Sequence, residues 1–170
     1  MKIERLKLVW ELAEIKKKSL EKSPLISIIT VVKNKSKVIE ETIQSVLNQK
    51  YNNIEYIVID GMSDDGTTEK IMKYKDLIDY FVCEKDLGLY DAMNKGLSLA
   101  RGDLIGIVNG DDILLPDATN ILIKYYTKHK DAEFFFGSVK KHWGTMHGFY
   151  PHKIKYSWFF YTSHSTGFFI

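Results

Sequence analysis

The chain has 170 residues, a size that suits one domain and allows a hydrophobic core without disulfides or a structural metal. Its 24 basic and 22 acidic residues leave a formal charge of +2, which is too small to indicate nucleic acid as a partner. Cys83 is the only cysteine, so an internal disulfide is excluded. With no signal-like start and no apolar run of roughly 20 residues, the sequence favours a reducing, cytoplasmic location.

The first segment, residues 1–23, is predicted to be one amphipathic helix. Ile3, Leu6, Val9 and Trp10 recur at helical spacing, and lysines crowd the far end of the segment. Two interpretations stay open. The helix packs on its own domain or on a second copy in a homodimer, or it rests on the anionic inner face of a cell membrane.

Residues 24–137 alternate between short apolar runs and amphipathic stretches. The apolar runs predict strands buried on both faces, as in a parallel sheet, and the amphipathic stretches predict helices. The expected strands are residues 25–32, 54–59, 80–83, 104–108 and 133–136, and the expected helices are residues 37–49, 67–75, 89–100 and 116–129. This order predicts an α/β fold with a mostly parallel, Rossmann-like central sheet flanked by helices, and with the N-terminal helix as an addition.

Polar clusters follow four of the expected strands, at the carboxyl ends where ligands bind in such sheets. The clusters are residues 33–34, 60–66, 84–86 and 109–112. In the last cluster, the neighbouring carboxylates of Asp111 and Asp112 repel each other. A Mg²⁺ or Mn²⁺ ion shared with substrate phosphates would offset that repulsion. A turn that caps the next helix explains the same residues, so this cluster alone does not decide between the two.

The cluster of residues 60–66 combines acids with two glycines before an expected helix. A carboxylate at this position can accept hydrogen bonds from a base or a ribose, and glycines let the backbone approach a ligand closely. The alternative is a tight turn with a capping residue, and Asp64 and Asp65 are expected to serve mainly in that way.

The third cluster opens the expected helix of residues 89–100. Asp91 and Lys95 lie four residues apart on one helix face and are expected to form an ion pair. Asn94 is a poor residue for the middle of a helix, so its side chain is expected to point at a partner.

Several other nucleotide and metal motifs are missing from the sequence. Residues 33–36, after the first strand, contain no glycine-rich dinucleotide motif, and no P-loop, zinc-protease or paired-cysteine motif is present. Their absence weighs against a dinucleotide-dependent oxidoreductase, a P-loop enzyme and a zinc site. Cys83, at the end of a strand, is expected to be a core residue rather than a nucleophile.

Taken in order, the clusters resemble the family 2 glycosyltransferases of the GT-A fold, in particular the bacterial branch that builds surface polysaccharides. Residues 26–34 are similar to the first strand of that family, and residues 58–67 look like its "DGGSTDGT" signature. Residues 84–96 resemble its "E-x-D-x-G-I-Y-D-A-M-N-K-G" block, and residues 109–112 stand at the place of its DXD metal motif. The ordered spacing over residues 25–137 makes the resemblance specific.

The resemblance implies that residues 24–137 form a nucleotide-sugar-binding core. It implies an inverting, metal-dependent hexosyl- or N-acetylhexosaminyl-transferase that moves a sugar from a UDP-linked donor to a glycan or lipid-linked acceptor. Asp60 would contact the base, and Asp111 and Asp112 would hold Mn²⁺ or Mg²⁺ on the diphosphate. The residues implied for nucleotide-sugar binding are Thr30, Val31, Val32, Asn34, Asp60, Asp86, Gly88, Asp91, Asn94, Asn109 and Gly110.

The sequence departs from the family pattern in three ways. Asn109 replaces the first acid of the DXD motif, and Met62 stands where the family has a small glycine. The family uses a carboxylate after the DXD motif as general base, but no Asp or Glu follows Glu133. We therefore expect residues 138–170 to begin an acceptor-side region that stops before the base, with His164 as a weak substitute.

Two other functions stay open on the sequence alone. A sugar nucleotidyltransferase has a similar sheet, but it requires a glycine-rich basic loop after the first strand, which is missing here. A non-catalytic domain that binds a nucleotide sugar, or that serves only as a scaffold, would also explain the missing base.

Overall fold

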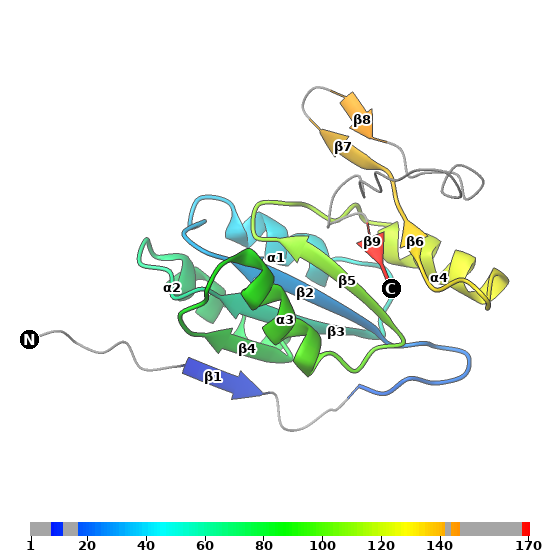
Figure 1. The fold of residues 1–170 in the computed structure, drawn as a ribbon, viewed down its shortest axis with the longest axis horizontal. Helices are drawn as coiled ribbons and strands as arrows, with labels where there is room; N and C mark the ends of the chain where they lie inside the picture. The colour runs from blue at the N-terminus through cyan, green and yellow to red at the C-terminus, as the bar shows by residue number, and fades with distance from the viewer. Residues whose placement is uncertain (1–7, 12–16, 142–143, 147–167) are drawn as a thin grey trace, which may run out of the picture.

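The computed structural model describes residues 8–11, 17–141, 144–146 and 168–170 (Figure 1). Within these residues, the central sheet has seven strands in the order β1-β4-β3-β2-β5-β9-β6. They are β1 (Leu8–Glu11), β2 (Ile26–Val32), β3 (Ile54–Asp60), β4 (Tyr80–Cys83), β5 (Leu104–Asn109), β6 (Phe135–Phe136) and β9 (Phe168–Phe169). Strands β2 to β5 run parallel, and β1 and β9 join them antiparallel. A hairpin of β7 (Val139–Lys141) and β8 (Gly144–Met146) forms a separate sheet.

Helices cover both faces of this sheet (Figure 1). They are α1 (Ile39–Leu47), α2 (Thr67–Met72), α3 (Leu89–Leu99) and α4 (Ala118–Lys128), with a short 3₁₀ helix at Lys75–Leu77. Alternate residues of β2 divide between the faces, since successive side chains of a strand point in opposite directions. Ile29 packs in one cluster with Met93 of α3, and Ile28 packs in the other with Ile43 of α1 and Leu122 of α4.

The predicted α/β fold with a mostly parallel sheet and flanking helices is confirmed. All seven residues of β2 and all seven of β3 are buried, as their continuous apolar runs predicted. Each element predicted between residues 24 and 137 is present, with bounds that lie within three residues of the prediction.

The predicted N-terminal helix is wrong for the described part of residues 1–23. Leu8–Glu11 form β1, which pairs antiparallel with β4, and residues 17–23 contain no helix. Without β1, strand β4 would present unpaired backbone groups at the edge of the sheet, so pairing competes with helix formation. Val9 and Trp10 also suit a strand better than a helix. A contact of this segment with a membrane surface or with a second copy of the chain stays a prediction.

Residues near the C-terminus also belong to the central sheet. Strand β9 lies between β5 and β6, and a methyl group on Gly106 of β5 would lie 2.2 Å from the Phe169 ring. Part of the segment 138–170, expected to begin an acceptor-side region, therefore completes the sheet. His164 lies outside the described residues. In the described part of the chain, no helix is both long enough and apolar enough to cross a bilayer.

Candidate functional site

The parallel strands bring four polar loops to one edge of the sheet (Figure 1). In the sheet register Val32 pairs with Asp60, Asp60 pairs with Cys83, and Val31 pairs with Asn109. The loops that follow these strand ends are residues 33–37, 61–66, 84–88 and 110–117. The convergence predicted from the sequence is therefore confirmed, and these loops form the candidate site.

The loop of residues 33–37 is held by the loop of residues 61–66 and by Thr67, the first residue of α2. The bonds run from Asn34 N to Ser63 Oγ (2.8 Å), from Lys35 N to Thr67 Oγ1 (2.9 Å), from Ser36 N to Asp65 Oδ2 (3.0 Å) and from Asp64 N to Asn34 Oδ1 (2.9 Å). Asn34 has a φ of 53°, in the left-handed region that asparagine tolerates better than most residues. The position of residues 33–37 is thus fixed by polar side chains of the second loop.

Asp60 is the internal anchor of that second loop. Its carboxylate is fully buried and accepts hydrogen bonds from Ser63 N (3.1 Å), Ser63 Oγ (2.5 Å) and Thr68 Oγ1 (2.5 Å). The Cys83 thiol donates to the same carboxylate, and burial together with the Asp60 charge raises the pKa of Cys83 to about 11. The resemblance implies a contact of Asp60 with the nucleotide base, which stays a prediction; in the structure the Asp60 side chain points inward and organises the loop.

Asp65 fastens the start of α2. The hydroxyl and the amide of Thr67 both donate to it (2.5 and 3.0 Å), as does the amide of Ser36. The Thr67 hydroxyl, followed by the Ser36 amide, holds the pKa of Asp65 well below its usual range. Asp65 thus holds the predicted tight turn before α2, but the N-cap of the helix is Gly66 and no side chain caps it, so the predicted capping is wrong.

Asp86 lies directly over Gly61. A methyl group on Gly61 would lie 2.1 Å from Asp86 Oδ2 and 3.3 Å from Lys33 Cδ, so only glycine leaves room for this approach. The other oxygen of Asp86 accepts a hydrogen bond from Gly88 N (3.1 Å). Gly88, with a φ of 128°, turns the chain into α3. Asp86, from the loop after β4, is therefore held against the loops after β2 and β3.

Lys95 of α3 joins the helix to the loop after β4. Its ammonium lies 3.2 Å from Glu84, 3.1 Å from Asp91 and 3.0 Å from the carbonyl oxygen of Lys85. Burial acts to lower the pKa of Lys95, but the bonds to Asp91 and Glu84 outweigh it and raise that pKa. The Leu87 amide, followed by Lys95, lowers the pKa of Asp91. The predicted pair of Asp91 and Lys95 is confirmed.

The predicted binding residues Asn94 and Thr30 differ in their exposure to solvent. Asn94 is exposed on the surface of α3. Thr30 is fully buried inside the sheet, where its hydroxyl lies 3.0 Å from that of Tyr56, so its side chain is part of the core.

The acidic turn of residues 109–112 is built on β5. Asp112 N donates to Asn109 O (2.9 Å), and the Asn109 side-chain amide donates to Asp112 Oδ2 (2.8 Å). Gly110 N donates to Val31 O (2.9 Å), and a methyl group on Gly110 would lie 2.5 Å from Val32 Cγ2. The turn is therefore pressed against the end of β2.

Asp111 carries the exposed carboxylate of this turn, with 46% of its side chain exposed. Lys35 Nζ lies 2.5 Å from Asp111 Oδ2. Lys35 was not among the predicted site residues, because spacing along the chain does not show where a long side chain ends.

The acidic turn fits a metal that is shared with a substrate. Among the described residues, no three His, Cys, Asp or Glu side chains are grouped so that they could hold a metal. Mg²⁺ usually takes one or two carboxylates and completes its coordination with water and substrate phosphates. Asp111, with Asp112 beside it, offers that kind of partial site.

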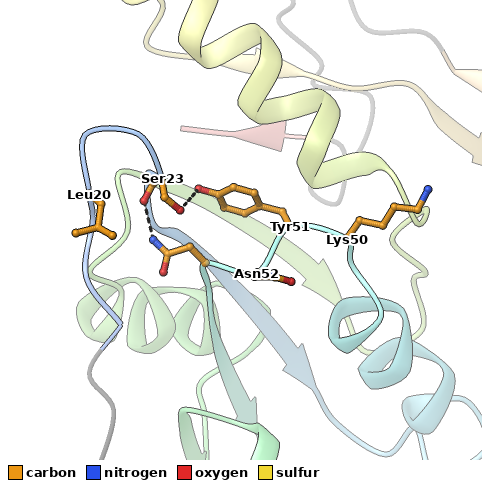
Figure 2. Close-up of a pocket in the computed structure, with 6 residues that line it drawn as sticks. Leu20, Ser23, Lys50, Tyr51 and Asn52 are labelled. Carbon is orange, nitrogen blue, oxygen red and sulfur yellow. Dashed lines mark hydrogen bonds between the residues drawn. The ribbon is translucent and has the colours of Figure 1, made fainter.

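A separate hollow of about 390 Å³ lies at the opposite edge of the sheet (Figure 2). It is lined by Leu20, Ser23, Lys50, Tyr51, Asn52 and Asn53. Their polar groups fasten the chain that leads into β2, since Asn53 Nδ2 donates to Ser23 O (2.7 Å) and the hydroxyls of Ser23 and Tyr51 lie 3.2 Å apart. This hollow is lined by residues that lie before β2 and β3 in the chain, at the ends where these strands begin. It is therefore not part of the candidate site, which lies at their carboxyl ends.

Residues 27–168 match the family model described as glycosyl transferase family 2. The chain belongs to this family. The match covers the four loops of the candidate site and ends at the first residue of β9. This glycosyltransferase chain therefore has the GT-A type of α/β fold that its motifs predicted.

Curated relatives of this family 2 chain are longer proteins. An uncharacterised glycosyltransferase of Methanocaldococcus jannaschii is 29% identical over 154 residues, which cover 84% of this chain and 53% of the relative. The glycosyltransferase GlyG of Streptococcus pneumoniae is 32% identical over 119 residues, which cover 68% of this chain and 39% of the relative. The chain thus spans about half the length of the first relative and less of the second.

Solved structures show the same fold. The mannosyltransferase PcManGT of Pyrobaculum calidifontis, in complex with GDP-Man and Mn²⁺, superposes with a TM-score of 0.58 at 26% identity. The match covers 69% of this chain and 36% of PcManGT. Residues 1–349 of TarS from S. aureus, in complex with UDP-GlcNAc, give a TM-score of 0.57 at 22% identity and cover 62% of this chain and 32% of that one.

Proposed function

We propose that this chain binds a UDP-linked sugar at the carboxyl edge of β2–β5, with Mn²⁺ or Mg²⁺ at Asp111. In the whole reaction the sugar passes, with inversion, to a hydroxyl group of a glycan or lipid-linked acceptor. The observation that carries the proposal is that Asp86, the acidic turn 109–112 and the loop 33–37 meet at one edge of the sheet. The UDP-GlcNAc bound by TarS and the GDP-Man and Mn²⁺ bound by PcManGT support it.

The acidic turn takes the diphosphate in this proposal. A divalent ion there supplies Lewis-acid stabilisation of the departing nucleoside diphosphate. Asp111 provides the exposed carboxylate, and the bond from Asn109 to Asp112 keeps the turn in shape. Gly110 lets the turn lie close to Val32 at the end of β2.

The remaining loops surround the rest of the donor. Asp86 is placed to accept hydrogen bonds from the ribose or the donor sugar, since it is only partly buried beside Gly61. Asn34 and Gly88 fix the loops on either side of it. Asn94 is exposed on α3, where it is free of the core to meet the sugar.

Donor binding, rather than deprotonation of the acceptor, is the part of the reaction that we assign to the described residues. The carboxylates of Asp60, Asp65 and Asp91 are all engaged in internal hydrogen bonds. A general base must face the acceptor hydroxyl on the side opposite the leaving group. We therefore assign these three carboxylates to holding the loops and the start of α3.

Calorimetry with UDP-, GDP- and dTDP-sugars, each with and without Mn²⁺, tests the proposal. We expect UDP-sugar binding that is at least about tenfold tighter with Mn²⁺, a gain of about 1.4 kcal/mol. Asp111→Ala should remove the dependence on Mn²⁺. Asp131→Ala is the matched control, because Asp131 is an exposed acid beyond the C-terminal end of α4 and outside the four loops. If no nucleotide binds in any condition, the scaffold alternative replaces this proposal.

A further inference from the structure

Lys35 and Asp111 form a surface ion pair at the carboxylate that is proposed to bind the metal. Lys35 Nζ lies 2.5 Å from Asp111 Oδ2, on the carboxylate to which the proposed function assigns a metal. The two side chains are 43% and 46% exposed, so solvent, ions and ligands reach both. The ammonium therefore stands at one of the oxygens that a divalent cation would use.

The backbone of Lys35 is fixed by hydrogen bonds, whereas its ammonium is held at Asp111 by an exposed ion pair. Lys35 N donates to Thr67 Oγ1 (2.9 Å), and Lys35 O accepts from Val38 N and Ile39 N (both 3.0 Å). A lysine side chain has a flexible stem that carries a compact charge. The fold thus places the ammonium of Lys35 at the acidic turn, on a stem long enough to reach an anion that binds beside that turn.

We infer that Lys35 is an internal counter-ion, which occupies Asp111 while the donor site is empty and moves to the diphosphate when metal and donor bind. The inference rests on the proposed function of the site. It makes Lys35 a positioning residue for the donor and not a reacting group.

The consequence is a coupling between metal and nucleotide. A divalent ion that arrives alone must displace the ammonium of Lys35 from Asp111 and remain near a like charge, which weakens its binding. When a diphosphate arrives with the ion, the displaced ammonium gains a new anionic partner. Metal and nucleotide therefore strengthen each other's binding, and the same factor applies in both directions.

The affinity for Mn²⁺ without nucleotide is the direct test, measured from the electron paramagnetic resonance signal of the free ion at low salt. We expect Lys35→Met to bind Mn²⁺ about three- to tenfold more tightly than the wild type, because an exposed ion pair and a nearby like charge each contribute modestly. Lys35→Arg keeps the cation and should stay near the wild type. Lys50→Met, which breaks the exposed pair with Asp117, should leave the affinity unchanged.

A second measurement separates displacement from simple loss of structure. With Mn²⁺ saturating, Lys35→Met and Lys35→Gln should bind UDP about three- to tenfold more weakly than the wild type, since the diphosphate loses one cation. Tighter metal binding with weaker nucleotide binding is a combination that a damaged loop would not produce. Both effects should shrink at high salt.

Two further outcomes separate the role of Lys35 from the proposed function. If the wild type binds UDP with Mn²⁺, but Lys35→Met binds free Mn²⁺ no more tightly, the counter-ion role is wrong and the proposed function stands. If the folded wild type binds neither Mn²⁺ nor any nucleotide diphosphate, the proposed function is wrong and the role of Lys35 is wrong with it.

Discussion

Replacing Asp60 with alanine should destabilise the protein by about 2–4 kcal/mol, although this residue was expected to contact a nucleotide. Its buried carboxylate accepts three hydrogen bonds at 2.5 to 3.1 Å from Ser63 and Thr68. A hydrogen bond to a charged group contributes about 1.5–3 kcal/mol, and a buried donor left without an acceptor costs about 1–3 kcal/mol. The two hydroxyls can turn to other acceptors, but the Ser63 amide cannot, so the loss stays below the sum of three bonds.

Urea unfolding of the wild type, Asp60→Ala and Asp60→Asn measures this loss. The asparagine variant keeps one acceptor oxygen, so its loss should be about half that of the alanine variant. Cys83 supplies an independent readout, since the Asp60 charge contributes to its raised pKa of about 11. Asp60→Asn should therefore speed alkylation of Cys83 in the folded protein at about pH 8. A loss below about 0.5 kcal/mol for Asp60→Ala, with unchanged Cys83 reactivity, would refute the role of Asp60 as an internal anchor.

Three further changes probe other parts of the structure. Gly110→Ala forces a methyl group to 2.5 Å from Val32 Cγ2, so melting should show a loss of about 1–3 kcal/mol and calorimetry should show weaker Mn²⁺–UDP binding. Arg101→Met removes the two contacts of the guanidinium with Oε1 of the fully buried Glu55, which are 2.6 Å from Nη2 and 2.7 Å from Nε. Urea unfolding should show a loss of about 2–4 kcal/mol in stability, with the affinity for UDP unchanged. Because the pKa of Asp65 is lowered in the folded state, its stabilising effect is present above the ordinary Asp pKa and is lost as the pH falls toward the lowered value. Asp65→Asn should therefore flatten the fall in melting temperature from about pH 5 to about pH 2, and parallel curves for the two proteins would contradict this.

The central elements were predictable because burial on both faces leaves a local signature. Strands β2 and β3 are continuous apolar runs, and all their residues are buried. Strand β1 was not predictable in the same way. Whether Leu8–Glu11 form a strand depends on β4, which lies some 70 residues away along the chain and offers an unpaired edge. Strand β9 has only two residues, too few for any periodicity.

The candidate site was predictable in outline because parallel strands carry their carboxyl ends to one edge. The direction of individual side chains was not. Asp60 turns inward because Ser63 and Thr68 offer donors there, and such partners become visible only when the loop is folded. Lys35 reaches Asp111 across 76 positions in the sequence, because Thr67 at the start of α2 holds the Lys35 backbone and so fixes where its side chain begins.

The central claim, that the acidic turn binds the metal and the donor diphosphate, is tested most directly by a crystal structure of the protein with UDP and Mn²⁺. The anomalous signal of the ion should lie within bonding distance of an Asp111 oxygen and of the diphosphate, with Lys35 moved from Asp111 onto the phosphates. An ion and a nucleotide bound away from the carboxyl edge of β2–β5, or a nucleotide bound there without any ion at Asp111, would contradict the account.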